Sequence, residues 1–132
     1  MATLMTDAER NALANAEAVR ITHLSLHTAS PGITGASEVT GGSPAYARKP
    51  VSFTAAGVQG TLGETLQPAT VGVAWSNEAI FDVPAGTYSH WGSWSGLAGT
   101  FRIGNVILPA SQVPVSQAQI KHSIGIGAVS GA

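Results

Sequence analysis

The chain has 132 residues, which is enough for one domain with a modest hydrophobic core. Only 10% of its residues are charged and its net charge is −1, so it lacks the basic field that binds nucleic acid or an anionic membrane. It contains no cysteine and no apolar run of the ~18 residues that span a bilayer, which excludes disulfides, thiolate zinc sites and membrane-spanning helices.

Residues 1–20 are expected to form a short helical arm. Thr6-Asp7-Ala8-Glu9 fits a capping box, in which a threonine hydroxyl and a glutamate satisfy the first free amides of a helix. Good helix formers then continue to Val19, with Leu13, Ala16 and either Ala12 or Val19 on the apolar stripe. That stripe is narrow and rich in alanine, so we expect the helix to lie against a neighbouring chain.

The rest of the chain, residues 21–132, has the patterns of a β domain. The expected strands cover residues 21–27, 48–55, 70–75, 79–83, 88–94, 100–108 and 118–128. Glycine- and proline-rich turn signals separate most of them. Short strands after a single helix indicate a mostly β fold, a single antiparallel β-sandwich of jelly-roll-like type, although the order of the strands stays open.

The longest stretch without a strand pattern is residues 27–50, which contains four glycines, three prolines and almost no charge before its end. Loops of more than ~12–15 residues are uncommon unless they are functional or disordered. We therefore expect this loop to be the main contact surface, anchored by Tyr46 and flanked by Arg48 and Lys49. The alternative is that its glycines and prolines only route the chain across the edge of the sandwich.

His23 and His27 are the first candidates for a metal site. In a strand, residues four apart are separated by about 13 Å, too far to share one ion. With Ser25 they form one face, which we expect to meet solvent or another subunit. His122 lies in the apolar row of the last strand, where we expect a hydrogen-bonded core histidine. We expect no metal site.

Two glycine-rich segments look like catalytic motifs, but each lacks an essential residue. Residues 92–96 place Trp94 where a hydrolase carries its nucleophilic serine. Residues 125–131 have Ser130 where a dinucleotide-binding loop needs its third glycine. Acid–base catalysis needs paired carboxylates, and beyond the helix the carboxylates are isolated in the sequence. We therefore expect no enzyme activity, no catalytic residue and no cofactor.

Aromatic side chains gather at residues 88–94. Strand alternation sends Tyr88, His90 and Trp94 to one face and Trp91 to the other. At least one of these faces belongs to the core. An aromatic on the second face is a candidate for protein contact or for a sugar-binding platform.

The run LSLHTASPGITGASEVTGGSPAYARKPVSF (24–53) is followed by FDVPAG (81–86), SHWGSW (89–94) and GTFRIG (99–104). In this order and spacing, the motifs resemble a family of small structural proteins from tailed bacteriophages of actinobacteria, usually labelled tail fibre or minor tail proteins. The resemblance covers nearly all of residues 20–105, and residues 57–75 depart from the shorter versions of the family. It implies a non-enzymatic virion protein with a β-rich fold.

The compact size of the chain favours a capsid decoration or minor capsid protein over a long, repetitive fibre. A minor tail or tail-fibre-associated subunit is the alternative. A second alternative is a carbohydrate-binding module that recognises the host surface through Trp91 or Trp94. These hypotheses differ in copy number per particle and in their dependence on the two tryptophans.

The expected partners are other virion proteins and further copies of the chain, with no nucleic acid and no membrane. The low charge supports this, because a free monomer with so few charges is poorly protected against association. The N-terminus lacks the pattern of a signal peptide, so we expect assembly into the virion in the host cytoplasm and no secretion. The candidate contact residues are Pro31, Ile33, Val39, Pro44, Tyr46, Arg48, Lys49, Trp91 and Trp94.

Overall fold

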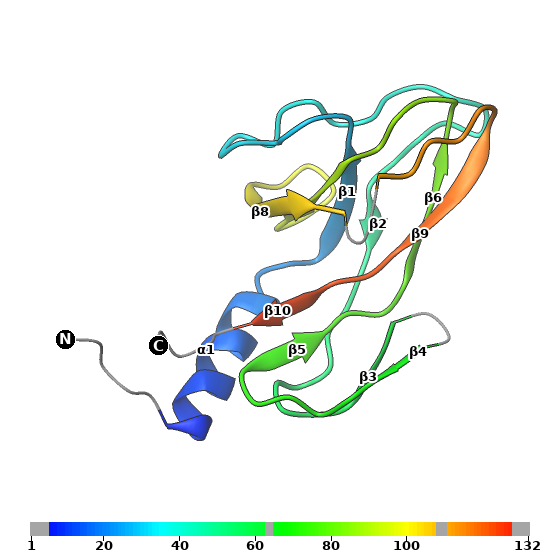
Figure 1. Ribbon diagram of the computed structural model, residues 1–132. Helices are drawn as coiled ribbons and strands as arrows, with labels where there is room; N and C mark the ends of the chain where they lie inside the picture. Colours follow the sequence, from blue (N-terminus) through cyan, green and yellow to red (C-terminus); the bar gives the residue numbers. More distant parts are fainter. Residues whose placement is uncertain (1–5, 63–64, 108–110, 128–132) are drawn as a thin grey trace. The chain divides into compact units, whose positions relative to one another are not determined.

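The computed structural model describes residues 6–62, 65–107 and 111–127 (Figure 1). In these ranges the protein is mostly β with a single N-terminal helix, α1 (Asp7–Ala18), which confirms the expected fold class at this level. The strands are β1 (His23–His27), β2 (Lys49–Pro50), β3 (Gly60–Leu62), β4 (Thr65–Gln67), β5 (Val73–Trp75), β6 (Ala79–Val83), β7 (His90–Trp94), β8 (Phe101–Val106), β9 (Ala118–His122) and β10 (Gly125–Gly127).

The strands form several small antiparallel sheets. The largest has the order β2-β1-β7-β8, and the two-stranded sheets are β10-β5, β3-β4 and β6-β9. In the large sheet Leu26 pairs with Trp91, and Trp91 in turn pairs with Asn105. The strand order makes β1 and β7 the inner strands of this sheet, each with a neighbour on both sides.

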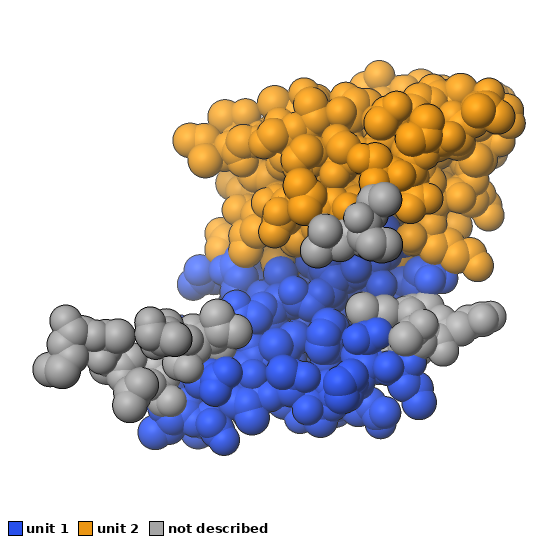
Figure 2. Space-filling model, in the orientation of Figure 1, with its two compact units in different colours: residues 1–20, 52–78, 122–132 blue, residues 21–51, 79–121 orange. Residues whose placement is uncertain are grey.

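The contacts of the chain divide it into two compact units (Figure 2). Unit 1 comprises residues 1–20, 52–78 and 122–132, and unit 2 comprises residues 21–51 and 79–121. The sequence predicts a boundary at residue 20, between a helical arm and a β domain. In the structure α1 shares a unit with β5 and β10, which come much later in the chain, and it contacts both (Figure 1).

The helix begins as predicted: Thr6 is its N-cap and accepts a hydrogen bond from the Glu9 amide at 3.2 Å. The predicted apolar stripe is wrong, because Leu13 is 44% exposed and Ala16 is also exposed, while Ala14 and Ala18 are buried. Small residues on this face allow the helix to approach the β segments of unit 1 closely. This helix of 12 residues, the one found in the described part of the chain, is too short to cross a membrane.

Two asparagines fix the buried face of α1. The Asn11 Oδ1 atom accepts the Gly72 amide, and the Asn15 Oδ1 atom accepts the Ala56 amide, each at 2.7 Å. These two amides lie in turns that have no strand partner for them, so the helix supplies their acceptors. The small core beside them consists of Ala14, Ala18, Ala56 and Ala74, with Phe53 packed against it.

Unit 2 holds the larger apolar core. Its buried apolar side chains include Leu24 and Leu26 of β1, Phe81 and Val83 of β6, and Ile120 of β9. The buried Tyr88 ring donates its hydroxyl hydrogen to the Pro84 carbonyl. Two hydrogen bonds between the backbones of Tyr88 and Gln112 hold the segment before β7.

The strand predictions differ in accuracy. β6 has the predicted bounds, and β1, β5, β7 and β8 lie within the predicted ranges. The strand expected at 48–55 is reduced to β2 and one bridge at Phe53, and the strand expected at 118–128 is interrupted between β9 and β10. The β3-β4 hairpin is not among the predicted strands. Positions 108 and 128 of the predicted strands lie outside the described residues.

Candidate functional site

The loop from residue 28 to residue 48, which we call the 28–48 loop, connects β1 to β2 and is closed at its middle. Glu38 forms a backbone bridge to His27, and the amides of Thr28 and Val39 donate to the carbonyls of Ser37 and Leu26, each at 3.0 Å. These bonds divide the segment into two smaller loops, with turns at residues 32–35 and 42–45. The 28–48 loop therefore has a defined shape, which is fixed by backbone hydrogen bonds between its middle and the end of β1.

Glu38 is the centre of this closure. Its carboxylate accepts two hydrogen bonds of 2.9 Å from Arg48, one from Nε and one from Nη2, and a third of 3.0 Å from the Tyr46 hydroxyl. The side chains of Arg48 and Glu38 are only 17% and 19% exposed. A bidentate pair shielded in this way is stronger and more specific in geometry than an exposed ion pair.

Tyr46 connects the loop to strands β1 and β6. Its hydroxyl accepts the Leu26 amide at 3.0 Å, and its ring stacks on Phe81 with the ring centres 6.0 Å apart. Burial raises the pKa of Tyr46 above its usual value, so the phenol keeps the proton that it donates to Glu38. Tyr46 therefore anchors the loop inward and is not an exposed contact residue.

Arg48 also covers Trp94. Its Cζ atom lies 3.3 Å from the centre of the Trp94 ring, and its Nη1 atom donates to the Leu97 carbonyl at 2.9 Å. A guanidinium over an indole is a favourable cation–π contact. Trp94 is left only 7% exposed, so its ring offers no open platform.

Beneath Trp94 lies a fully buried polar chain. The Trp94 Nε1 atom donates to Ser25 Oγ at 2.7 Å, and Ser25 Oγ lies 2.7 Å from His27 Nε2. The other ring nitrogen, Nδ1, is 2.7 Å from the Ala36 carbonyl, which can only accept, so Nδ1 carries the proton. Nε2 then accepts the Ser25 hydroxyl hydrogen. Burial lowers the pKa of His27, in agreement with a neutral ring.

The prediction that Ser25 and His27 face solvent or a subunit is wrong, because both side chains are 0% exposed. The 28–48 loop and the ring of Phe101 cover this face of β1, and the Phe101 and His27 ring centres are 6.3 Å apart. A serine hydrogen-bonded to a histidine has the spacing of a nucleophile and its base. Here no substrate can reach the serine, so the pair ties the loop to the strand. His23, by contrast, is half-buried and bonds to the Thr22 hydroxyl.

The nine predicted contact residues separate by exposure. Those buried are Pro31, Val39 and Trp94; those half-buried are Tyr46, Arg48, Lys49 and Trp91; and those exposed are Ile33 and Pro44. The structure joins Tyr46, Arg48 and Trp94 through Glu38 and leaves the two exposed residues on the two turns. Ile33, at 94% exposure, is the most exposed large apolar residue in the described part of the chain.

Sequence reasoning missed Glu38 as the hub. The available signal was that residues 28–48 contain one carboxylate, Glu38, and one other charged residue, Arg48, ten positions later. The pairing itself depends on the fold of the loop.

His122 is half-buried, and burial lowers its pKa to about 4. Among the residues that the structure describes, no three histidine or carboxylate side chains gather into a group that could hold a metal ion.

The hydrogen bonds around Glu38 and along the chain from Trp94 to His27 hold the 28–48 loop in place, and the polar groups that form them are directed inward. Chemistry on a substrate would require reactive groups that a substrate can reach, and the Ser25–His27 pair is not accessible in this way.

A scan against models of known protein families finds none that matches this chain, and a search of curated proteins finds no matching relative.

Proposed function

We propose that this chain is a non-enzymatic structural protein of a tailed bacteriophage particle, bound to the capsid surface as a decoration or minor capsid protein. The motifs in residues 24–53 and 81–104 that resemble small phage virion proteins are one support. The observation that carries the proposal is the 28–48 loop, which is fixed from within yet leaves Ile33 94% exposed. A preformed loop loses little conformational entropy when it docks.

Other exposed apolar side chains of unit 2 support assembly with other proteins or with further copies of the chain. Leu97, Val113 and Val115 are 63%, 62% and 92% exposed. Single exposed apolar residues are normal on any protein. This chain, however, has few charged residues whose repulsion would keep its molecules from associating in solution. Burial of these side chains against a partner would remove their apolar surface from water and so favour assembly.

We also propose that the strands of unit 2 pack as an antiparallel sandwich of jelly-roll-like type. The four-stranded sheet and the β6-β9 pair each contribute buried apolar side chains, and β2 contacts β6. The stacked rings of Tyr46 and Phe81 support a packed layer between the loop and β6. Facing sheets in a sandwich share their core in this way.

Copy number in the virion tests the location. Quantitative mass spectrometry of purified particles should find hundreds of copies of the chain, and capsids that lack tails should retain it. A few to some tens of copies that purify with tails would replace the capsid role by that of a minor tail or tail-fibre-associated subunit. Absence from purified particles would contradict the virion proposal.

Substitution of the exposed loop residue tests the contact surface. Ile33→Ser should lower incorporation into particles at least severalfold without changing the thermal unfolding midpoint, because its side chain contributes nothing to the core. Val58→Ser is the matched control, since Val58 is 50% exposed, lies in unit 1 and is not among the residues proposed for the contact. Equal incorporation of the two variants would exclude the loop as the docking surface.

A further inference from the structure

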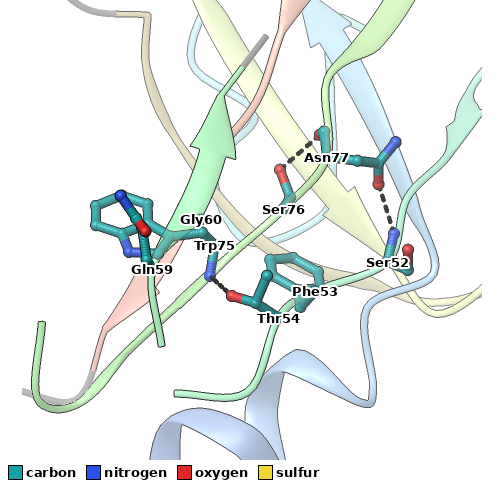
Figure 3. A pocket seen from close by; sticks show the side chains of 8 residues that line it. All are labelled: Ser52, Phe53, Thr54, Gln59, Gly60, Trp75, Ser76 and Asn77. Carbon is teal, nitrogen blue, oxygen red and sulfur yellow. Dashed lines mark hydrogen bonds between the residues drawn. The ribbon is translucent and has the colours of Figure 1, made fainter. Parts of the chain in front are cut away.

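Unit 1 contains a pocket of about 290 Å³ that the proposed function does not use (Figure 3). Its lining comes from three segments of the chain: Ser52, Phe53 and Thr54; Gln59 and Gly60; and Trp75, Ser76 and Asn77. None of these residues is charged. In Figure 3, Trp75 and Gln59 lie on one side of the view and the Ser52–Asn77 pair lies on the other.

Hydrogen bonds hold the walls in place. The Asn77 Oδ1 atom accepts the Ser52 amide at 2.7 Å, and Thr54 Oγ1 accepts the Trp75 amide at 3.3 Å (Figure 3). Ser76 Oγ accepts the Ile124 amide and donates to the Asn77 carbonyl, both at 2.9 Å. These polar atoms already have hydrogen-bond partners within the protein. They therefore hold the walls of the pocket in place and are not counted as partners for a ligand.

Other polar groups of the lining remain available to a ligand. Gln59 and Ser52 are exposed, and neither side chain is engaged by another described residue. The Trp75 Nε1 atom is buried and out of reach of a ligand, so Trp75 contributes ring carbons to the lining and no donor.

We propose that this pocket binds a single neutral sugar ring. An uncharged lining gives no favourable partner to a phosphate, a carboxylate or a cation. Two aromatic residues, Phe53 and Trp75, together with hydroxyl and amide groups match the apolar faces and the hydroxyls of a pyranose. The volume lies at the lower end for ligand pockets, which fits one ring and not a longer glycan.

This site differs from the platform that the sequence suggested at Trp91 and Trp94. Trp94 lies under Arg48, whereas Trp75 lines a pocket. The inference does not depend on a virion location, because it uses only residues of unit 1. A failure of sugar binding would therefore leave the capsid proposal standing, and the reverse also holds.

Titration with methyl glycosides of glucose, galactose, mannose and N-acetylglucosamine tests the site. The chain has three tryptophans, so a ¹H–¹⁵N spectrum resolves three indole signals, and loss of one signal in Trp75→Phe assigns it. At millimolar concentration at least one glycoside should shift the Trp75 signal and leave those of Trp91 and Trp94 unchanged. No shift with any of the four glycosides would overturn the proposal.

A double variant tests the polar lining. Ser52→Ala with Gln59→Ala should raise the dissociation constant for the glycoside roughly three- to tenfold, which is the effect of losing one net hydrogen bond. Ser116→Ala with Gln112→Ala is the matched control, because it changes the same residue types at exposed positions that do not line the pocket. A dissociation constant that is equal in both double variants would also overturn the proposal.

Discussion

Glu38 holds the 28–48 loop through one side chain. It receives Arg48 in a bidentate pair and Tyr46 through its hydroxyl, and Arg48 in turn covers Trp94. Removing the carboxylate would leave a poorly exposed guanidinium without its counter-charge, and the hydroxyl of Tyr46 without its acceptor. For a shielded pair, the loss of one partner costs more than the net value of the pair.

We therefore predict that Glu38→Ala lowers the free energy of unfolding by about 2 kcal/mol or more. Urea unfolding followed by tryptophan fluorescence measures this, since Trp94 lies in the same network. Arg20→Ala is the control: it breaks a 4.0 Å pair with Glu17 in which Arg20 is 62% exposed, and it should cost less than about 0.5 kcal/mol. A similar loss in the two variants would contradict the role of Glu38 as a hub.

At the scale of elements, β1 and the 28–48 loop form one structure. β1 is an inner strand whose last four residues are all buried, so both of its faces need cover. The loop covers the face that carries Ser25 and His27, and it accepts a hydrogen bond from the His27 ring at Ala36. Close packing of the loop on Trp94 depends on a glycine at position 35.

Gly35→Ala should loosen this packing. Gly35 has a φ of +77°, and a Cβ there would lie 2.5 Å from the Trp94 Cη2 atom. We expect the free energy of unfolding to fall by at least about 2 kcal/mol, from backbone strain and overpacking together. Thermal or urea unfolding measures the loss.

Gly32→Ala is the matched comparison within the same turn. Its φ is +58°, but a Cβ there would meet nothing within 4 Å, so only the strain of about 1 kcal/mol remains. If both alanine variants lost the same free energy, the contact between the loop and Trp94 would not contribute to stability.

At the scale of the whole molecule, each unit contains a histidine whose protonation is disfavoured by folding: the buried His27 in unit 2 and the half-buried His122 in unit 1. Burial lowers the pKa of His27 in unit 2, and it lowers the pKa of His122 in unit 1 from 6.5 to about 4. As the pH falls below 6.5, the unfolded chain therefore takes up protons that the folded chain does not. Stability from this source is complete above pH 6.5 and declines towards pH 4.

We predict that the free energy of unfolding falls between pH 6.5 and pH 4, with a slope of up to about 1.4 kcal/mol per pH unit from His122 and a further decrease in the same direction from His27. Urea midpoints measured across this range test the slope. His122→Gln should make the slope shallower by up to one proton. An unchanged slope in that variant would show that His122 titrates normally in the folded chain.

Local patterns in the sequence predicted several elements correctly. The Thr6 cap, the helix after it, the bounds of β6 and the β-rich class depend on residues within a few positions of one another. Turn signals also indicated a shaped segment between β1 and β2. In each case the deciding interactions are local, so a single sequence is enough to reveal them.

The tertiary structure alone decided which faces are buried and which side chains meet. Alternation separated Ser25 and His27 from the leucines of β1, but only Trp94 and Ala36, brought in by the sheet and the loop, made that second face interior. Likewise, the bonds of Asn11 and Asn15 to distant turns explain why Ala14 is buried and Leu13 is not. Sequence by itself determined the elements. Burial depends on partners tens of residues away, which a local pattern does not encode.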